Sequence, residues 1–309
     1  MNFENTEAFH TDEGLHLATS EILFQRILVA TDFSKPAEQA LKTAIAISQS
    51  FGSQLFLVHA APPFYYNTGS EIMSPDVVDI NLDVVKEKLH GLIESDPALK
   101  ALQPRTTVDY GDVLDLISEV VRKEKVDLIV VGTHGASGVE RLALGSVAEC
   151  VLRHASCPVL IVGPHCKPEQ YPFRSIVFAT DLTTTGLRGA QYACGLAERF
   201  HGKLTLLHVV EKRSQTPGAE SELIEQRIQQ ELRQLLPPDV EQYSRANVCI
   251  EYGNPSEAIS DVARQEFASL VVIGVGRQGA LADHSPWSTL SHLTHSLTCA
   301  VLGVRGHLA

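Results

Sequence analysis

Glycines and a serine recur in this sequence at a spacing that suits phosphate binding. The stretch VGTHGASGVERLALGSVAECVLRHA at 131–155 contains Gly132, then Gly135, then nine residues, then Gly145 and Ser146. A glycine-rich turn lets main-chain N–H groups approach a ligand with no Cβ in the way. A helix that begins at Ser146 would direct its positive dipole end and its free N–H groups to the same place. The spacing therefore indicates a phosphate site, although glycines also form turns, and serines also cap helices, where no ligand binds.

The helix after this loop has its own sequence signals. Ser146 and Glu149 form the S-x-x-E pair that is typical of a capping box. Val147, Val151 and Leu152 would lie on its apolar side. We therefore expect the helix to begin at the end of the glycine spacing, with its first turn facing the ligand.

The chain repeats itself, and the repeat places the loop at the end of a strand. Five segments of the first half match five of the second half in the same order. The pairs are 26–34 with 175–183, 55–60 with 204–210, 108–112 with 250–254, 127–132 with 269–274, and 156–162 with 298–304. The offset is 149 residues for the first two pairs and 142 for the others, so the duplication carries a length difference of seven residues.

Each matched segment is a short run of β-branched residues or leucines, which is typical of a strand buried on both faces. Amphipathic helical patterns lie between them, at 37–50, 76–95, 112–125 and 220–236. In the first pattern Ser34 can cap the helix and Pro36 suits its first turn. Alternating strands and helices predict an α/β fold in which each half is a five-stranded parallel sheet flanked by about four helices. The expected boundaries are a flexible extension over 1–22, a first domain over 23–163, a linker over 164–172 and a second domain over 173–309.

The spacing G-x2-G-x9-G-S resembles the nucleotide-binding signature of the ATP-binding universal stress proteins and meets it without deviation. The opening ILVATDFS and the closing SCPVLIV are also similar to that family. The likeness covers both halves, roughly residues 24–163 and 172–305. It implies tandem Rossmann-like domains of the adenine nucleotide alpha hydrolase-like kind and, as ligand, ATP or another adenine nucleotide, with or without Mg²⁺.

Carried over position by position, the resemblance implies contacts at the ends of three strands and at the start of the helix after the loop. These positions are Ala30, Thr31, Asp32, Ala60, Val131, Gly132, Gly135, Gly145, Ser146 and Val147. Ala30 departs from relatives that have proline there. Ala60 is smaller than the usual branched residue, which could loosen the slot for adenine.

Polar side chains add to this set. Because a carboxylate repels phosphates unless a cation intervenes, Asp32 is better placed to accept hydrogen bonds from ribose hydroxyls or the adenine amino group. The alternative is an Asx turn or cap at the end of the strand. His134, Ser137 and Arg141 lie within the loop and could contact the distal phosphates, although loop side chains are usually solvated.

The second half has lost most of the signature. When Gly274 is aligned with Gly132, Arg277 stands in the place of Gly135 and Trp287 in the place of Gly145, while Ser288 is kept. We expect weak or absent ATP binding there, with a pocket repurposed around Arg277 as the alternative. Asp181 remains as the counterpart of Asp32.

Two other patterns in the second half indicate little. Gly274, Gly276 and Gly279 spell G-x-G-x-x-G, but a dinucleotide fingerprint follows the first strand of its unit, whereas this one follows the fourth. His292 and His295 have helical spacing without an evident third metal ligand. We expect neither NAD nor a metal.

No motif supplies an evident general base for attack on a γ-phosphate. We therefore expect a nucleotide-binding regulator, with a slow ATPase or self-phosphorylating enzyme as one alternative and an interaction module without nucleotide as another. Single-domain relatives commonly dimerise through their last strands. The resemblance thus implies an internal pseudo-dimer with 156–162 against 298–304, and two such chains could associate further.

Composition restricts the partners. The net charge is −12, which argues against nucleic acid as a partner. Residues 1–163 hold 12 Lys and Arg against 22 Asp and Glu, so main-chain N–H groups are the expected donors to any anion bound there. No apolar run reaches the roughly 20 residues of a membrane helix, and the acidic start lacks the pattern of a signal peptide. Six cysteines without a CxxC pair favour a reducing cytoplasm.

Overall fold

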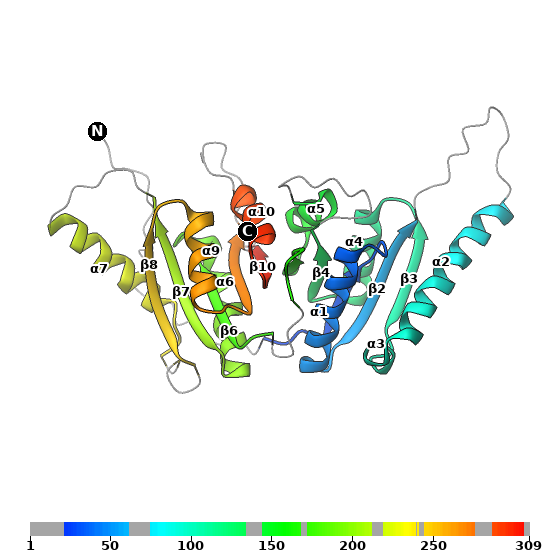
Figure 1. Ribbon diagram of the computed structural model, residues 1–309, viewed down its shortest axis with the longest axis horizontal. Coiled ribbons are helices and arrows are strands. Elements are labelled where there is room, and N and C mark those ends of the chain that lie inside the picture. The colour runs from blue at the N-terminus through cyan, green and yellow to red at the C-terminus, as the bar shows by residue number, and fades with distance from the viewer. Residues whose placement is uncertain are drawn as a thin grey trace, which may run out of the picture.

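Two five-stranded parallel sheets join edge to edge into one ten-stranded sheet in the computed structural model of the protein (Figure 1). The structure describes residues 22–61, 75–133, 144–167, 172–211, 219–238, 240, 244–275 and 286–305. Over these residues the strand order is β3-β2-β1-β4-β5-β10-β9-β6-β7-β8. The α/β class and the parallel sheet of each half, which the sequence predicts, are confirmed.

The strands and helices alternate along the chain. The strands are β1 (Arg26–Ala30), β2 (Gln54–Ala61), β3 (Arg105–Tyr110), β4 (Leu128–Gly132), β5 (Val159–Val162), β6 (Ser175–Ala179), β7 (Lys203–Val210), β8 (Ala246–Tyr252), β9 (Leu270–Val275) and β10 (Ala300–Arg305). The helices are α1 (Lys35–Phe51), α2 (Pro75–Ser95), α3 (Pro97–Ala101), α4 (Val113–Glu124), α5 (Ser146–His154), α6 (Thr184–Phe200), α7 (Ala219–Gln234), α9 (Pro255–Gln265) and α10 (Pro286–Ser296). The helical patterns at 37–50, 76–95, 112–125 and 220–236 correspond to α1, α2, α4 and α7, and the helix expected from Ser146 is α5. The short α3 was not expected.

The helices cover both faces of the sheet, because successive strand residues point to opposite sides. In β1, Ile27 belongs to a buried cluster with residues of α1, α2, α3, α6 and α7. Its neighbour Leu28 belongs to a second cluster with residues of α4, α5, α9 and α10. Both side chains are fully buried, which explains why the strand sequences show no polar alternation.

Helix α1 begins as its sequence predicts. The Ser34 side chain accepts a hydrogen bond from the N–H of Ala37 at 3.3 Å, and Pro36 lies in the first turn, so the predicted cap is confirmed. The helix ends at Gly52, whose φ of 70° is the left-handed conformation that glycine adopts without strain. The Gly52 N–H donates to the carbonyl of Ser48.

The two halves meet where β5 and β10 pair in antiparallel orientation. Leu160 lies opposite Leu302, and Ile161 lies opposite Val301. All four side chains are at most 2% exposed. The predicted pairing of 156–162 with 298–304 is thereby confirmed for the strands that these segments contain, and the two halves form an intramolecular pair.

Aromatic rings reinforce this junction on the face covered by α1 and α6. Phe51, at the end of α1, lies 5.2 Å from Phe200, at the end of α6, in an edge-on arrangement. Phe173, just before β6, lies 4.8 Å from Phe200 and 5.8 Å from Phe51. The guanidinium of Arg199 lies 4.8 Å from the centre of the Phe51 ring. Residues far apart in the sequence thus share one apolar contact between the halves.

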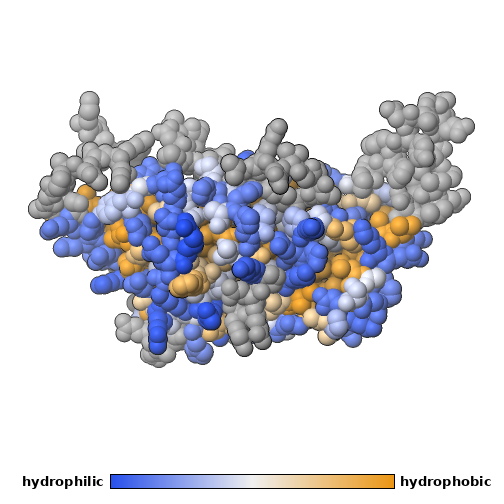
Figure 2. Space-filling model, viewed as in Figure 1, coloured by the Kyte–Doolittle hydropathy of each residue, from blue (hydrophilic) through white to orange (hydrophobic). Residues whose placement is uncertain are grey.

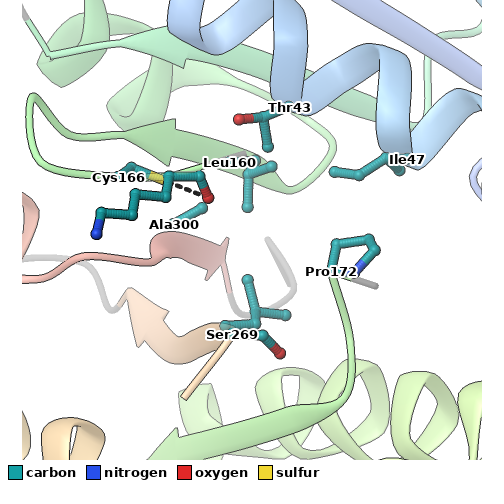
Figure 3. A pocket seen from close by; sticks show the side chains of 9 residues that line it. Thr43, Ile47, Leu160, Cys166, Pro172, Ser269 and Ala300 are labelled. Carbon is teal, nitrogen blue, oxygen red and sulfur yellow. Dashed lines mark hydrogen bonds between the residues drawn. The ribbon is translucent and has the colours of Figure 1, made fainter. Parts of the chain in front are cut away.

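A small cavity lies on the same face of the junction (Figure 3). Its lining comes from both halves and includes Thr43 of α1, Leu160 of β5, Ser269 and Ala300. Its volume is about 20 Å³, which is room for roughly one water molecule. Pockets for small molecules are usually some 300 Å³ or larger, so this cavity is not a candidate for a nucleotide site.

The described surface is largely hydrophilic on the face drawn in Figure 2, with apolar patches between the polar residues. Large exposed apolar side chains include Val84 of α2, Leu223 and Ile224 of α7, and Phe267. No helix in the described ranges has the length and apolar character needed to cross a membrane. Nor do three His, Cys, Asp or Glu side chains gather as a metal site anywhere in those ranges.

We expect Phe173→Ala to lower the free energy of unfolding by about 3–5 kcal/mol, because it removes a ring that is 2% exposed and contacts both halves. Phe267→Ala is the matched control, since Phe267 is 82% exposed, and its effect should stay within about 0.5 kcal/mol. Urea denaturation monitored by circular dichroism measures both values. Equal effects of the two substitutions would contradict the role given to this aromatic contact.

Candidate functional site

The predicted site residues come from three neighbouring strands of the first half. Strand β1 lies between β2 and β4, with Ala30 in register with Val58 and Val29 in register with Val130. The three strands are parallel, so their carboxyl ends lie at one edge of the sheet. The strand that follows β1 in the chain, β2, pairs with one edge of β1, and β4 pairs with its other edge. The strand order therefore reverses at β1. Open α/β sheets bind ligands outside such a switch in strand order.

Small and branched apolar side chains meet at this edge. Ala30, Ala60 and Val147 are half-buried and pack against the same buried cluster, to which Val131 belongs. They come from β1, β2, α5 and β4, so the structure brings together four residues that the sequence places far apart. Ala30 and Ala60 thus place partly exposed apolar side chains at the carboxyl ends of two neighbouring strands.

Two residues of α4 that were not predicted as site residues pack against the same cluster from the start of their helix. Val113 and Leu114 occupy the first turn of α4 and are half-buried, and both pack against the same cluster. The sequence places them on the apolar face of the helix pattern at 112–125, where they count as core. A further signal was available, because a helix that follows β3 must begin at the carboxyl edge of the sheet.

The turn after β1 holds Thr31 and Asp32 by local hydrogen bonds. The Thr31 hydroxyl accepts from the N–H of Phe33 at 3.1 Å, and the Asp32 carboxylate accepts from the N–H of Ser34 at 3.0 Å. Phe33 has a φ of 61°, so the chain makes a tight left-handed step here. Asp32 is exposed and forms the Asx turn that was the structural alternative to a role in ligand binding.

The second half forms the same turn. The Thr180 hydroxyl accepts from the N–H of Leu182 at 3.0 Å, and the φ of Leu182 is 60°. The Asp181 carboxylate accepts from the N–H of Thr183, also at 3.0 Å. The turn is therefore part of the architecture of both halves, including the half whose loop has lost the glycine signature. A test of Asp32 as a ligand group must leave this turn intact.

A histidine fixes each turn from the neighbouring strand. His59 Nδ1 lies 2.7 Å from the carbonyl oxygen of Thr31, and His208 Nδ1 lies 2.9 Å from that of Thr180. Because the carbonyl oxygen can only accept, each Nδ1 carries the proton. The two histidines thus have a structural role that the sequence analysis did not assign.

Packing requires a glycine at position 132, which the sequence analysis names as an expected ligand contact. A Cβ at this position would lie 2.8 Å from the carbonyl oxygen of Pro36 and 2.9 Å from its carbonyl carbon. The end of β4 therefore passes directly against the first turn of α1. A side chain here would force the two main chains apart.

The start of α5 differs from the prediction. Gly145 is the N-cap residue, and no side chain makes a capping hydrogen bond there. Ser146 is already the first helical residue, and the Glu149 carboxylate pairs with Arg153 one turn later. The predicted capping box is therefore wrong, because the cap falls one residue earlier, on a residue without a side chain. The first N–H groups of α5 are left without a side-chain cap, which suits an anion at this place.

Thr133 ties the end of β4 to the start of α5. Its carbonyl accepts from the N–H of Gly145 at 2.6 Å, and its own N–H donates to Val162. Its hydroxyl is fully buried and has no hydrogen-bond partner among the described residues. The two ends of the loop are thus held close together. Gly135, His134, Ser137 and Arg141 lie between these ends and outside the described residues.

Three cysteines are unsuited to nucleophilic chemistry. Burial raises the pKa of the Cys157 and Cys194 thiols to about 12. Burial and the nearby Glu251 carboxylate raise the pKa of Cys249 to about 11. These thiols stay protonated at neutral pH, and the thiolate is the reactive form. All six cysteines of the chain are free of disulfides.

The corresponding region of the second half has a different start of its helix. Gly274 lies near the end of β9, as Gly132 does in β4. Helix α10 begins at Pro286, which is two residues earlier than the counterpart of Ser146. Proline lacks an N–H group, so the first turn of α10 offers one amide fewer than that of α5. Arg277 lies outside the described residues.

Comparisons with known proteins point to one family. The family model described as "Universal stress protein family" matches residues 23–163 and 172–305. A universal stress protein of Methanocaldococcus jannaschii is 32% identical over 158 residues, which cover 47% of this chain and 86% of that protein.

Solved structures give the same result for the fold. The crystal structure of a universal stress protein from Archaeoglobus fulgidus covers 93% of this chain and 98% of its own, with a TM-score of 0.64 at 21% identity. A universal stress protein solved in complex with cAMP covers 46% of this chain and 98% of its own, with a TM-score of 0.32 at 24% identity.

We expect Gly132→Ala to lower the free energy of unfolding by about 1–3 kcal/mol, because its Cβ would collide with the main chain at Pro36. Gly91→Ala is the matched control. Gly91 lies in α2 with open space around it, and alanine there should stabilise the helix by up to about 1 kcal/mol. Chemical denaturation measures both changes, and a neutral Gly132→Ala would contradict the close approach of β4 to α1.

Proposed function

Because the chain belongs to the universal stress protein family, we propose that its first half binds an adenine nucleotide as a regulatory ligand in the stress response. The observation that carries the proposal is the complete glycine signature, whose described positions are Gly132, Gly145 and Ser146. We propose ATP as this ligand. The six free cysteines suit the reducing cytoplasm, where we propose that the protein works.

The proposed phosphate position is the start of α5. The first N–H groups of a helix lack partners within the helix, and here no side chain caps them. The positive end of the helix dipole favours an anion at the same place. The acidic composition of the first half is compatible with this arrangement, because the donors are main-chain groups rather than basic side chains.

The proposed adenine position is the apolar surface around Ala30 and Ala60. These residues are half-buried, and they pack against the same buried cluster as Val113 and Leu114 of α4. The second half has Val209 in the place of Ala60, so the first half leaves more room at this position. Asp32 would accept hydrogen bonds from ribose hydroxyls or the adenine amino group at the exposed side of this surface.

A slow ATPase or self-phosphorylating enzyme is the second candidate. The exposed position of Ser146, at the start of the helix where the phosphates would lie, favours it, because its hydroxyl could accept a phosphoryl group. No described residue supplies an evident general base at this place. We therefore prefer a regulator that binds the nucleotide to an enzyme that hydrolyses it.

Mass spectrometry of small molecules released from the freshly purified, denatured protein should find an adenine nucleotide at about one per chain. Gly135→Arg should abolish this binding, because it gives the first half the residue that the second half has at Arg277 and places a side chain in the glycine turn. Arg277→Gly is the control and should leave binding unchanged. Two nucleotides per chain would contradict the degenerate second site, and none would contradict the proposed function.

Asp32→Asn should weaken ATP binding about 10- to 100-fold, because the variant loses a charged acceptor for the nucleoside. An asparagine oxygen can still accept from the Ser34 N–H, so the turn is kept. Asp181→Asn makes the same change in the same turn of the second half and should leave the affinity unchanged. Isothermal titration calorimetry measures both variants. Wild-type affinity in Asp32→Asn would show that Asp32 forms the Asx turn and does not bind the nucleotide.

A further inference from the structure

One hydrogen bond joins the edge of the proposed site to the other half of the chain. The N–H of Leu144 donates to the hydroxyl of Ser291 at 3.0 Å. Leu144 stands where the signature loop enters α5, directly before the N-cap residue Gly145. Ser291 lies in the middle of α10, which belongs to the second half. Figure 1 shows α5 and α10 next to each other above the junction of the two halves.

Packing holds Leu144 and α10 together around this bond. Leu144 is 7% exposed and belongs to the same buried cluster as Leu290 and Leu293 of α10. Helix α10 is itself fixed against the first half, because a Cβ on Gly163 would lie only 1.9 Å from the carbonyl oxygen of Thr294. Ser291 therefore reaches Leu144 from a helix that has little freedom to move relative to β5.

The internal repeat shows that this bond is one-sided. At the offset of 142 residues, the counterpart of Leu144 is Pro286 and that of Ser291 is Glu149. Proline has no N–H to donate, and the Glu149 carboxylate pairs with Arg153 of its own helix. The mirror bond cannot form, so the second half supports the loop of the first half without receiving the same support.

We propose that Ser291 is a positioning residue for the nucleotide site of the first half, an inference that rests on the proposed function. Its hydroxyl fixes the amide of the residue that leads into the N-cap of α5. The cap and the first turn of α5 then present their N–H groups in one arrangement. The half that has lost the glycine signature thus contributes to the affinity of the half that keeps it.

The positioning role predicts that Ser291→Ala weakens ATP binding about three- to tenfold, because a nearly buried amide loses its partner and the binding-competent arrangement is less populated. Ser291→Thr keeps a hydroxyl and should restore the affinity. Ser296→Ala is the matched control on the same helix, since Ser296 is exposed and its hydroxyl contacts Ser260 at 2.9 Å. Isothermal titration calorimetry with ATP measures all four proteins, including the wild type.

Hydrogen exchange gives a second readout that a purely structural serine would not change. Coupling between two sites is reciprocal, so ATP added to the wild type should slow amide exchange in α10, at 286–296. That protection should be smaller in Ser291→Ala. If the wild type binds ATP and Ser291→Ala binds it with the same affinity, this inference is overturned and the proposed function stays intact. The same holds if the wild type binds ATP and α10 gains no protection. A wild type that does not bind ATP overturns both.

Discussion

The antiparallel pairing of β5 with β10 is the constraint on which the rest of the structure depends. Without it, each half would end in a largely apolar edge strand, which is a template for aggregation. With it, the two edges are buried against each other, and the helices that precede them, α5 and α10, come together on one face. The aromatic contact of Phe51, Phe173 and Phe200 covers the other face. The entrance to α5 is therefore fixed by both halves.

The two halves keep the same framework while they differ at the proposed site. The turn of Thr31 and Asp32 recurs at Thr180 and Asp181 with the same hydrogen bonds and the same left-handed step. A framework element that recurs in a half without the signature cannot by itself indicate a ligand. The described helix starts differ in their residues: α5 follows the N-cap residue Gly145, whereas α10 begins with Pro286, which has no N–H group.

Much of this could be predicted from the sequence, because local signals and tertiary packing agree. Buried strands lack polar alternation, Ser34 caps α1, and the internal repeat identifies both halves. The strands that join the halves were implied by the family resemblance. The capping box failed because a shift of one residue decides whether a serine caps a helix or lies within it. The reason for Gly132 also lay outside the sequence, since it depends on how closely Pro36 approaches. The same holds for the bond of Leu144 to Ser291, which joins residues 147 positions apart.

Fusion of the two copies explains how such a bond can be one-sided. In a symmetric dimer of identical chains, every substitution appears at both sites, so a loss at one site is a loss at the other. In a tandem chain each copy can change alone, provided that the shared strands still pair. Pro286 and Ser291 are such changes, because the first removes a donor from the second half and the second supplies an acceptor to the first half. The second half thus contributes the strand edge that it buries and the amide of Leu144 that it holds.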